Sequence, residues 1–257
     1  MKGQIELNIG KTVHENASSY YEKAKELKKK SQSAGKAIED TKKAIASEVV
    51  ESAVAIPKKA VRVKREKKWF ERFHWFETGG YMVLAGRDAK QNEELVWKHL
   101  SEEDYFFHAD IRGAPATILK NGKKAPETIL TETAQFAASY SSAWKAGIAS
   151  VDVYCVEKSQ VSKEAQGEYL GTGSFVISGK RTWFRNTPLG LKIGVDETGN
   201  VHCAPESATF AFFKSLKVKL GPKEKGEAAR EIAKELCASV DEVLSALPAG
   251  KFGYEKN

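Results

Sequence analysis

The sequence has few of the residues that build redox, metal and membrane sites. Its three cysteines (Cys155, Cys203 and Cys237) stand far apart and form no CxxC pair. This pattern argues against a disulfide framework or a zinc site and fits a reducing cytosol. No apolar run approaches the ~20 residues that span a bilayer, and the N-terminus lacks the charged-then-apolar pattern of a signal peptide. We therefore expect a cytoplasmic protein with no membrane segment and with buried, unreactive thiols.

Motifs of the common catalytic and cofactor sites are also missing. The sequence has no HExxH, no G-x-S-x-G and no phosphate-binding loop. His108 and Asp110 lie two residues apart on an expected strand and so share a face, which leaves a general acid–base pair open. We expect no enzymatic activity, no metal and no cofactor. The alternative is an RNA-processing or RNA-modifying enzyme built on His108 and Asp110.

Positive charge is in excess, and the excess is local. The formal net charge is +7, yet residues 57–72 alone hold eight Lys or Arg against Glu66 and Glu71, a local +6. This basic segment leads into WFERFHWF, in which charged groups interleave with aromatic rings. A basic run beside planar side chains is typical of nucleic-acid binding. The ordinary alternatives are a solvated charged face and an aromatic stripe that belongs to the core.

Composition divides the chain into three regions. Residues 1–66 are rich in Lys, Glu, Ala and Ser and predict a helical, coiled-coil-like arm with a basic linker. The thin apolar stripe of this arm favours pairing with a helix in the stretch 49–76 or in a second chain. Residues 67–194 predict an α+β domain, and residues 195–257 predict a C-terminal extension of one strand and short helices. The expected fold class is α+β, with a mixed or antiparallel sheet and packed helices.

Local patterns place several elements in these regions. Apolar runs and period-two alternation predict strands in GYMVLAGR, YFFHADI, SVDVYCVEK and part of SFVISGKRTWF. Asp88 with Gln91 predicts the start of a helix over residues 88–100. The stretch 131–147 predicts one helix capped by Thr131. In the C-terminal extension, KSLKVKLGP predicts an amphipathic edge strand.

Five segments in order resemble the RNA-binding C-terminal domain of the NFACT family. These proteins are ribosome-quality-control factors whose bacterial members were first called fibronectin-binding-protein-like. The segments are WFERFHWF, GRDAKQNEELV, HADIRGAPATILKNG, TETAQFAASYSSAW and QVSKEAQGEYLGTGSFVISGKR. The similarity runs from about residue 67 to about residue 192. Upstream, ELNIGKTVHENASSYYEKAKELKKK resembles the entry to the family's coiled-coil region, and the tail resembles the extension of archaeal members.

The resemblance implies the RNA-binding module of a ribosome-associated quality control factor. Such factors bind large ribosomal subunits obstructed by a stalled nascent chain and recruit charged tRNA, typically alanyl-tRNA, so that a tail is added without mRNA. The family's large N-terminal domain, which recognises tRNA, has no counterpart in these 257 residues, and we expect a fragment or a truncated paralogue. The expected partners are rRNA or tRNA, the large ribosomal subunit, and a protein partner or second copy at the N-terminal helices.

The motif HADxxGA is a signature of that domain. We expect His108 and Arg112 to face a groove, with Asp110 holding one of them or capping the following turn. The alternative is an internally fastened loop, in which Asp110 pairs with Arg112 and Gly113 supplies an unusual backbone angle. A third function also stays open, a protein-interaction scaffold whose helical arm recruits partners. The predicted RNA-binding residues are Lys64, Arg65, Lys67, Lys68, Arg72, Arg87, His108, Asp110, Arg112, Lys163, Lys180 and Arg181.

Overall fold

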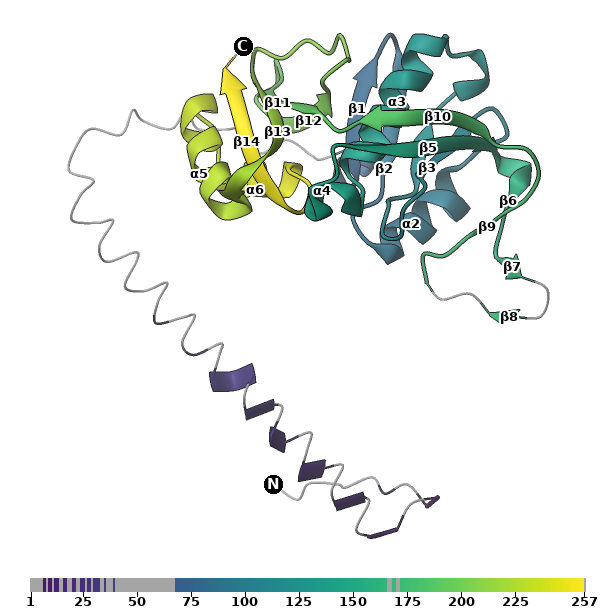
Figure 1. Cartoon of the computed structure of the whole chain (residues 1–257), viewed down its shortest axis with the longest axis vertical. Helices are drawn as coiled ribbons and strands as arrows, with labels where there is room; N and C mark the ends of the chain where they lie inside the picture. Colours follow the sequence, from purple (N-terminus) through teal and green to yellow (C-terminus); the bar gives the residue numbers. More distant parts are fainter. Residues whose placement is uncertain are drawn as a thin grey trace. The chain divides into compact units, whose positions relative to one another are not determined.

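The structure, a computed structural model, describes scattered positions between 7 and 39 and then residues 68–165, 168–169 and 172–256. The chain divides into two compact units, Met1–Arg65 and Glu66–Asn257. In the first unit the described positions from 13 to 39 have helical backbone (Figure 1). The partner helix expected within 49–76 falls mainly on positions outside the described residues. No helix of the described part of the chain is long and apolar enough to cross a membrane.

The second unit contains a six-stranded sheet with the order β1-β2-β4-β3-β5-β10 (Figure 1). Every neighbouring pair in it is antiparallel, which confirms the predicted α+β class with an antiparallel sheet. The strands GYMVLAGR, YFFHADI and SVDVYCVEK lie where the alternation of their residues predicts them. The six strands are β1 His74–Thr78, β2 Tyr81–Ala85, β3 Tyr105–Ala109, β4 Thr117–Leu119, β5 Ser150–Glu157 and β10 Thr182–Pro188.

Helices cover both faces of this sheet. On one face, α3 (Glu127–Ser139) packs against the strand residues that point its way, such as Phe107 and Cys155. On the other face, α2 (Ala89–Glu94) continues into a π-helical turn, η2 (Leu95–His99), and packs with Phe106 and Val156. Successive strand residues point to opposite faces, so β3 and β5 supply both cores. The remaining short helices before β10 are η1 Trp69–Arg72, η3 Gly122–Lys124, α4 Ser142–Ala146 and η4 Lys158–Gln160.

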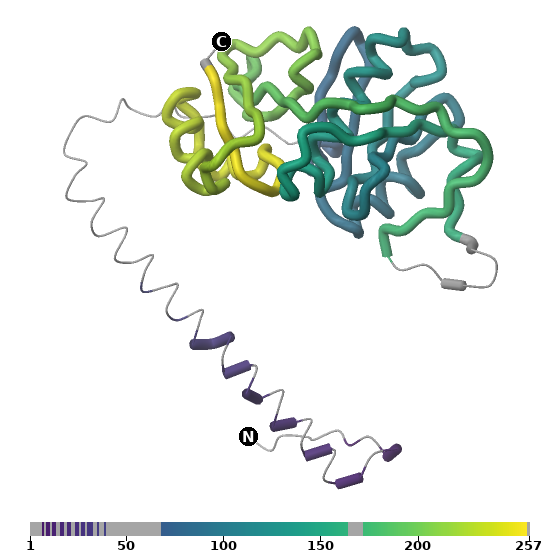
Figure 2. Tube along the Cα trace, viewed as in Figure 1, coloured from purple at the N-terminus to yellow at the C-terminus, as the bar shows by residue number. Residues whose placement is uncertain are grey.

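A second, four-stranded sheet follows in the order β12-β11-β13-β14. It carries α5 and α6, and Figure 2 shows β13 and β14 running side by side. Two pairs of very short strands complete the described structure. The four-stranded sheet and its helices are β11 Leu191–Val195, β12 Val201–Pro205, β13 Lys214–Glu224, β14 Lys251–Lys256, α5 Lys225–Leu236 and α6 Val240–Ala246. The short pairs are β6 Val161–Ser162 with β9 Val176–Ile177, and β7 Glu164–Ala165 with β8 Glu168–Tyr169.

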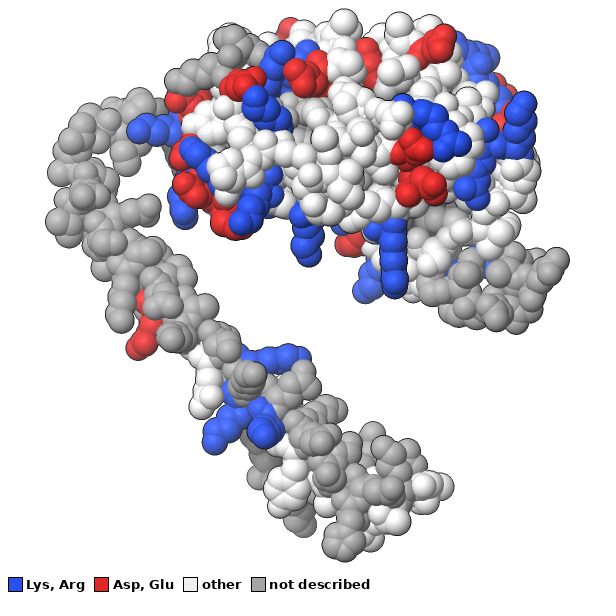
Figure 3. Space-filling view, viewed as in Figure 1, with Lys and Arg blue, Asp and Glu red and all other residues white. Residues whose placement is uncertain are grey.

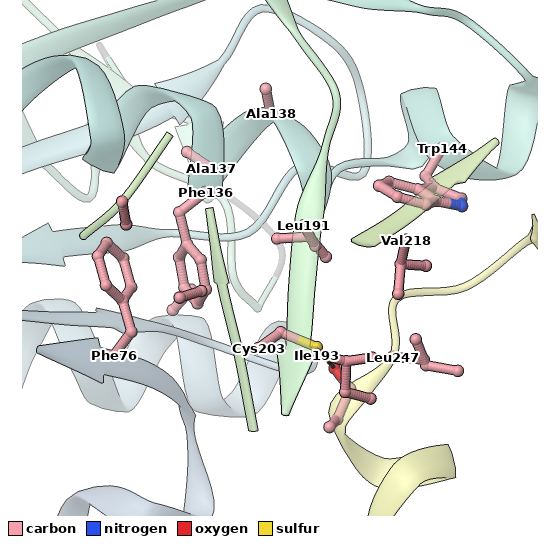
Figure 4. Packing of buried hydrophobic residues seen from close by; sticks show 14 of the residues in the cluster. Phe76, Phe136, Ala137, Ala138, Trp144, Leu191, Ile193, Cys203, Val218 and Leu247 are labelled. Atoms are coloured by element: carbon pink, nitrogen blue, oxygen red, sulfur yellow. Dashed lines mark hydrogen bonds between the residues drawn. The ribbon is translucent and has the colours of Figure 1, made fainter. Parts of the chain in front are cut away.

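One apolar cluster joins the two larger sheets. Figure 4 shows Phe76 and Phe136, whose ring centroids are 4.7 Å apart, in the same packed region as Leu191 and Val218. Each of these side chains is almost completely buried, and burying a side chain of this size contributes roughly 1.5–3 kcal/mol. Residues on either side of 194/195 therefore share a core, and a domain division at that point stays a prediction.

Three local predictions are wrong. The stretch 131–147 is two helices, because Ser141 turns the chain and accepts a hydrogen bond from the N–H of Ala143 at 3.2 Å. The first of the two, α3, begins four residues before Thr131, after Pro126. The strand β13 is interior, since it pairs with both β11 and β14. The thiols of Cys155 and Cys203 are buried as expected, but Cys237, which follows the last residue of α5 as its C-cap, is exposed.

Candidate nucleic-acid interface

Three rings form a row across the α2 face of the six-stranded sheet. His108 of β3 stands opposite Tyr154 of β5, and Tyr154 stands opposite Trp183 of β10. Directly opposed residues of antiparallel strands point to the same face. The ring centroids of His108 and Tyr154 are 5.9 Å apart, and those of Tyr154 and Trp183 are 5.3 Å apart. The rings thus form a row across three strands, in which Tyr154 is almost completely buried while His108 and Trp183 are half-buried.

Two guanidinium groups lie over this row. The Cζ atom of Arg181 is 4.6 Å from the ring centroid of Tyr154, and that of Arg185 is 4.0 Å from the ring centroid of Trp183. Arg185 also pairs with Asp152 at 2.5 Å. Both contacts have cation–π geometry. Positive charge and planar rings are therefore combined on one surface.

A cleft of about 460 Å³ opens beside the row. His108 and Tyr154 are part of its wall, together with residues from the segments GRDAKQNE, HADIRGAPA and GTGSF. We call it the motif cleft, because these three sequence motifs, far apart in the chain, meet there. Its lining consists of residues 86–89, 92, 106, 108, 112–115, 140, 154, 173–175 and 177.

Local backbone geometry fixes the walls of the motif cleft. Asp88 caps α2 by accepting a hydrogen bond from the N–H of Gln91 at 2.8 Å, as its position in the sequence predicts. The loop after β3 turns at Gly113 with φ +84°, a backbone angle that suits glycine. The carbonyl oxygen of Arg112 accepts a hydrogen bond from the hydroxyl of Ser142 at 2.6 Å. The loop is therefore held by its backbone, which leaves the side chain of Arg112 exposed.

The polar groups of the cleft differ in charge. Burial lowers the pKa of His108 below its usual value, with Asp110 opposing the shift, so the imidazole is neutral at pH 7. Arg87 is anchored, since its guanidinium donates to the carbonyl oxygens of Ser245 at 2.9 Å and Phe73 at 3.1 Å. Arg112 takes part in no ion pair among the described residues. The cleft therefore combines two cations, the carboxylate of Asp88 that caps α2, and a neutral ring.

Asp110 lies outside the lining of this cleft. It is exposed, and its N–H donates to the carbonyl oxygen of Asp152 at 2.7 Å. Within the described part of the chain, no ion pair joins it to Arg112, and no group of three His, Cys, Asp or Glu residues is placed to hold a metal. The alternative that the loop is fastened internally required two features. The unusual backbone angle at Gly113 is present, and the ion pair between Asp110 and Arg112 is not found among the described residues.

Residues 71–179 match the family model described as NFACT protein RNA binding domain. The archaeal Rqc2 homolog aRqcH of Methanocaldococcus jannaschii is 41% identical over 198 residues, which is 74% of this chain and 30% of that protein. The chain belongs to the NFACT family. The ribosome quality control complex subunit NEMF of Homo sapiens is 35% identical over 176 residues, 66% of this chain and 16% of that protein. The chain thus spans less than a third of the length of these relatives.

A solved structure is also similar to this NFACT chain. It is the C-terminal part of the fibronectin/fibrinogen-binding protein from Streptococcus suis, with 22% identity and a TM-score of 0.40. The match covers 69% of this chain and 77% of that chain.

The predicted contact residues of the NFACT domain separate into groups. Arg87, His108 and Arg112 line the motif cleft, and Arg181 reaches Tyr154 in its wall. The other predicted cations that the structure describes lie elsewhere or are engaged. Arg72 pairs with Glu94 and Lys163 pairs with Glu93, while Lys68 and Lys180 are exposed. Lys64, Arg65 and Lys67 lie outside the described residues.

Tyr154 and Trp183 were not among the predicted site residues of this NFACT domain. The sequence holds a signal for both. In SVDVYCVEK the alternation that buries Val153 and Cys155 under α3 places Tyr154 on the opposite face. An interpretation of the whole segment SVDVYCVEK as core packing overlooks this second face. Trp183 lies two residues after the cationic Arg181, and this spacing places the ring and the cation on the same face of an extended chain.

Proposed function

We propose that this chain is the RNA-binding module of a cytoplasmic ribosome-associated quality control factor, contacting rRNA or tRNA on obstructed large ribosomal subunits. The observation that carries the proposal is the convergence of three motif segments and an aromatic row on the motif cleft. The match to an RNA-binding domain family and the printed names of the relatives support it. The N-terminal helices would add a protein partner or a second copy.

An unpaired nucleotide fits the motif cleft. Its volume of about 460 Å³ lies within the range of roughly 300–1,000 Å³ that is usual for ligand pockets. A base stacks on an aromatic face regardless of its sequence. Tyr154 would supply that face once the guanidinium of Arg181 moves aside, since the ring is otherwise almost completely buried. Arg87 and Arg112 stand at the cleft to meet the flanking phosphates. Because bases in a duplex are already stacked on one another, we propose single-stranded loops or ends as the target.

The remaining predicted residues take lesser roles in this proposal. The basic segment with Lys64, Arg65, Lys67 and Lys68 would contact phosphates without reading bases. On the visible face of the second unit, Lys and Arg alternate with Asp and Glu (Figure 3). Arg72 and Lys163 contribute less, since each already has a carboxylate partner.

We assign no catalytic role to the His108–Asp110 pair. A general acid–base pair must reach the same reacting group, whereas His108 lines the motif cleft and Asp110 does not. This placement favours a binding surface over a reaction centre.

The test is the affinity of the whole chain for a ten-nucleotide single-stranded RNA, measured by fluorescence anisotropy over a salt series. Contacts to three phosphates give a slope near −2 in log K against log salt, a loss of about 20-fold between 50 and 200 mM. Sedimentation with purified large ribosomal subunits is the companion measurement. A flat salt dependence would contradict the proposal, and binding that requires only residues 1–66 would favour the scaffold.

A further inference from the structure

A second cavity adjoins the motif cleft. It has a volume of about 510 Å³ and shares Gly86, Arg87, Gly113 and Tyr140 with the motif cleft. Its far wall comes from α4, α5, the end of α6 and residues 247–249 that follow it. The two hollows therefore lie side by side, and together they extend from the motif segments to the C-terminal part of the chain.

The charges in this second cavity are all of one sign. Its lining contains the cations Arg87, Lys145 and Lys225, together with His74, whose pKa burial lowers well below its usual value, and it contains no Asp or Glu. None of these four takes part in an ion pair among the described residues. This is unusual for the unit, in which many lysines have carboxylate partners, for example Lys217 with Glu206 at 3.0 Å. We call the hollow the cation cavity.

Among the described residues, the hydrogen-bond partners of Lys225 and Arg87 are neutral. The ammonium group of Lys225 donates to the carbonyl oxygen of Leu247 at 2.8 Å, and Arg87 donates to the hydroxyl of Ser245 at 2.6 Å. Burial is the largest cause that lowers the pKa of both cations, and Arg87 further lowers that of Lys225. Like charges that are partly withdrawn from water, with no counter-charge, oppose folding. An anionic ligand would remove that cost.

We propose that the cation cavity binds a phosphate group of the RNA chain, next to the nucleotide held in the motif cleft. The inference rests on the proposed RNA-binding function and extends it to a second subsite. The adjacency of the two hollows makes the RNA backbone the source of the phosphate, since the strand that leaves the motif cleft passes Arg87 first. Lys145 and Lys225 then meet the next phosphate from two different helices.

The main test uses two substitutions of Lys225 in the whole chain and one matched control. Lys225→Met keeps the length of the side chain and removes its charge, and Lys225→Arg keeps the charge. The control is Lys234→Met, on the same helix and exposed, outside both hollows. Affinity for the ten-nucleotide RNA is measured over the same salt series, and the melting temperature of each variant is recorded.

We expect Lys225→Met to weaken RNA binding several-fold and to make the salt slope less steep by about 0.7, the loss of one phosphate contact. Lys225→Arg and Lys234→Met should bind like the unsubstituted chain. The melting temperature of Lys225→Met should be no lower than that of the control, because a cation without a counter-charge is removed. A purely structural lysine would give a lower melting temperature and an unchanged slope.

The outcomes separate this inference from the proposed function. If Lys225→Met leaves affinity and slope unchanged while Arg112→Ala weakens binding, the cation cavity is not an RNA subsite and the proposed function stands. If the unsubstituted chain shows no salt-dependent binding, the proposed function fails first. Inorganic phosphate is the third probe, with chloride at equal ionic strength as reference. Suppose that phosphate raises the melting temperature of the unsubstituted chain and not that of Lys225→Met, while both proteins bind RNA equally well. That result would assign the cavity to a free anion and overturn the RNA assignment.

Discussion

The guanidinium of Arg181 lies 4.6 Å from the ring centroid of Tyr154, so a cation covers the aromatic wall of the motif cleft. Arg181 is also 5.9 Å from the ring centroid of Trp183. Guanidinium groups and nucleobases stack on the same ring faces. An incoming base must therefore slide between Arg181 and Tyr154 or displace the arginine, and either arrangement keeps positive charge beside the base.

Tyr154→Leu should weaken single-stranded RNA binding by about 5- to 150-fold, because stacking of one base on an aromatic ring contributes roughly 1–3 kcal/mol. Tyr154→Phe is the matched control. It keeps the ring and removes only the hydroxyl, which makes no hydrogen bond to the described residues, so its affinity should be unchanged. Anisotropy titrations at one salt concentration decide the point. Equal losses in both variants would contradict stacking.

Arg112→Ala should lower RNA affinity and make the salt slope less steep by about 0.7, since its exposed guanidinium is placed to neutralise one phosphate. Its backbone carbonyl, not its side chain, is held by Ser142, so folding should be little affected. Lys234→Ala removes an exposed cation outside the cleft and serves as the reference. The salt series measures both. If Arg112→Ala matched Lys234→Ala, the cleft would not be where phosphate is bound.

The sequence predicts those features of the motif cleft that depend on the local geometry of a single residue. Asp88 caps α2 and Gly113 adopts a positive φ, and both follow from the chemistry of one side chain. The convergence of residues 86–89, 112–115 and 173–175 on one cleft does not follow from local patterns. It depends on the strand order β4-β3-β5-β10, which is set by long-range packing.

Two errors show which information alternation lacks. Period-two alternation in KSLKVKLGP reports one buried and one solvated face, and β13 has both, yet it lies between β11 and β14. Alternation therefore identifies faces and not edges. The predicted helix over 131–147 fails for a different reason. Its apolar spacing continues through Tyr140, where the backbone (φ −91°, ψ 2°) leaves the helix, and α4 starts at Ser142 with Ser141 as its N-cap.

The chain should lose stability as the pH falls from about 6.5 to about 4, and His202 is a principal cause. Burial lowers the pKa of His202 to about 4, against the attraction of Asp196 and Glu71. The unfolded chain takes up a proton near pH 6.5 while the folded chain does not, so acid favours unfolding. Full stability is present above pH 6.5, and the loss from this group approaches about 3 kcal/mol near pH 4.

Urea unfolding at pH 7, 5.5 and 4.5 measures this loss, with His202→Leu as the comparison. The imidazole makes no hydrogen bond through either ring nitrogen in the described structure, and its ring centroid lies 4.6 Å from that of Trp75. An apolar leucine at this position therefore leaves no hydrogen-bond partner unsatisfied. The variant should show a shallower decrease in the free energy of unfolding. Some decrease should remain, because burial also lowers the pKa of His74 and His108. Parallel curves for the two proteins would exclude His202 as the cause.

Gly173→Ala should abolish most RNA binding, whereas Gly80→Ala should not. Both glycines have a positive φ, +79° and +80°, so both substitutions carry the same backbone cost of about 1–2 kcal/mol. The two positions differ in the room that they leave for a Cβ atom. A Cβ at Gly173 would stand 2.8 Å from the backbone of Ala89 at the start of α2, while a Cβ at Gly80 meets nothing within 4 Å. Gly173 and Ala89 both line the motif cleft, so only the first substitution pushes its walls apart. Anisotropy titration and thermal melting of both variants test this difference. Equal RNA affinities would mean that the contact between the 173–175 loop and α2 does not shape the binding surface.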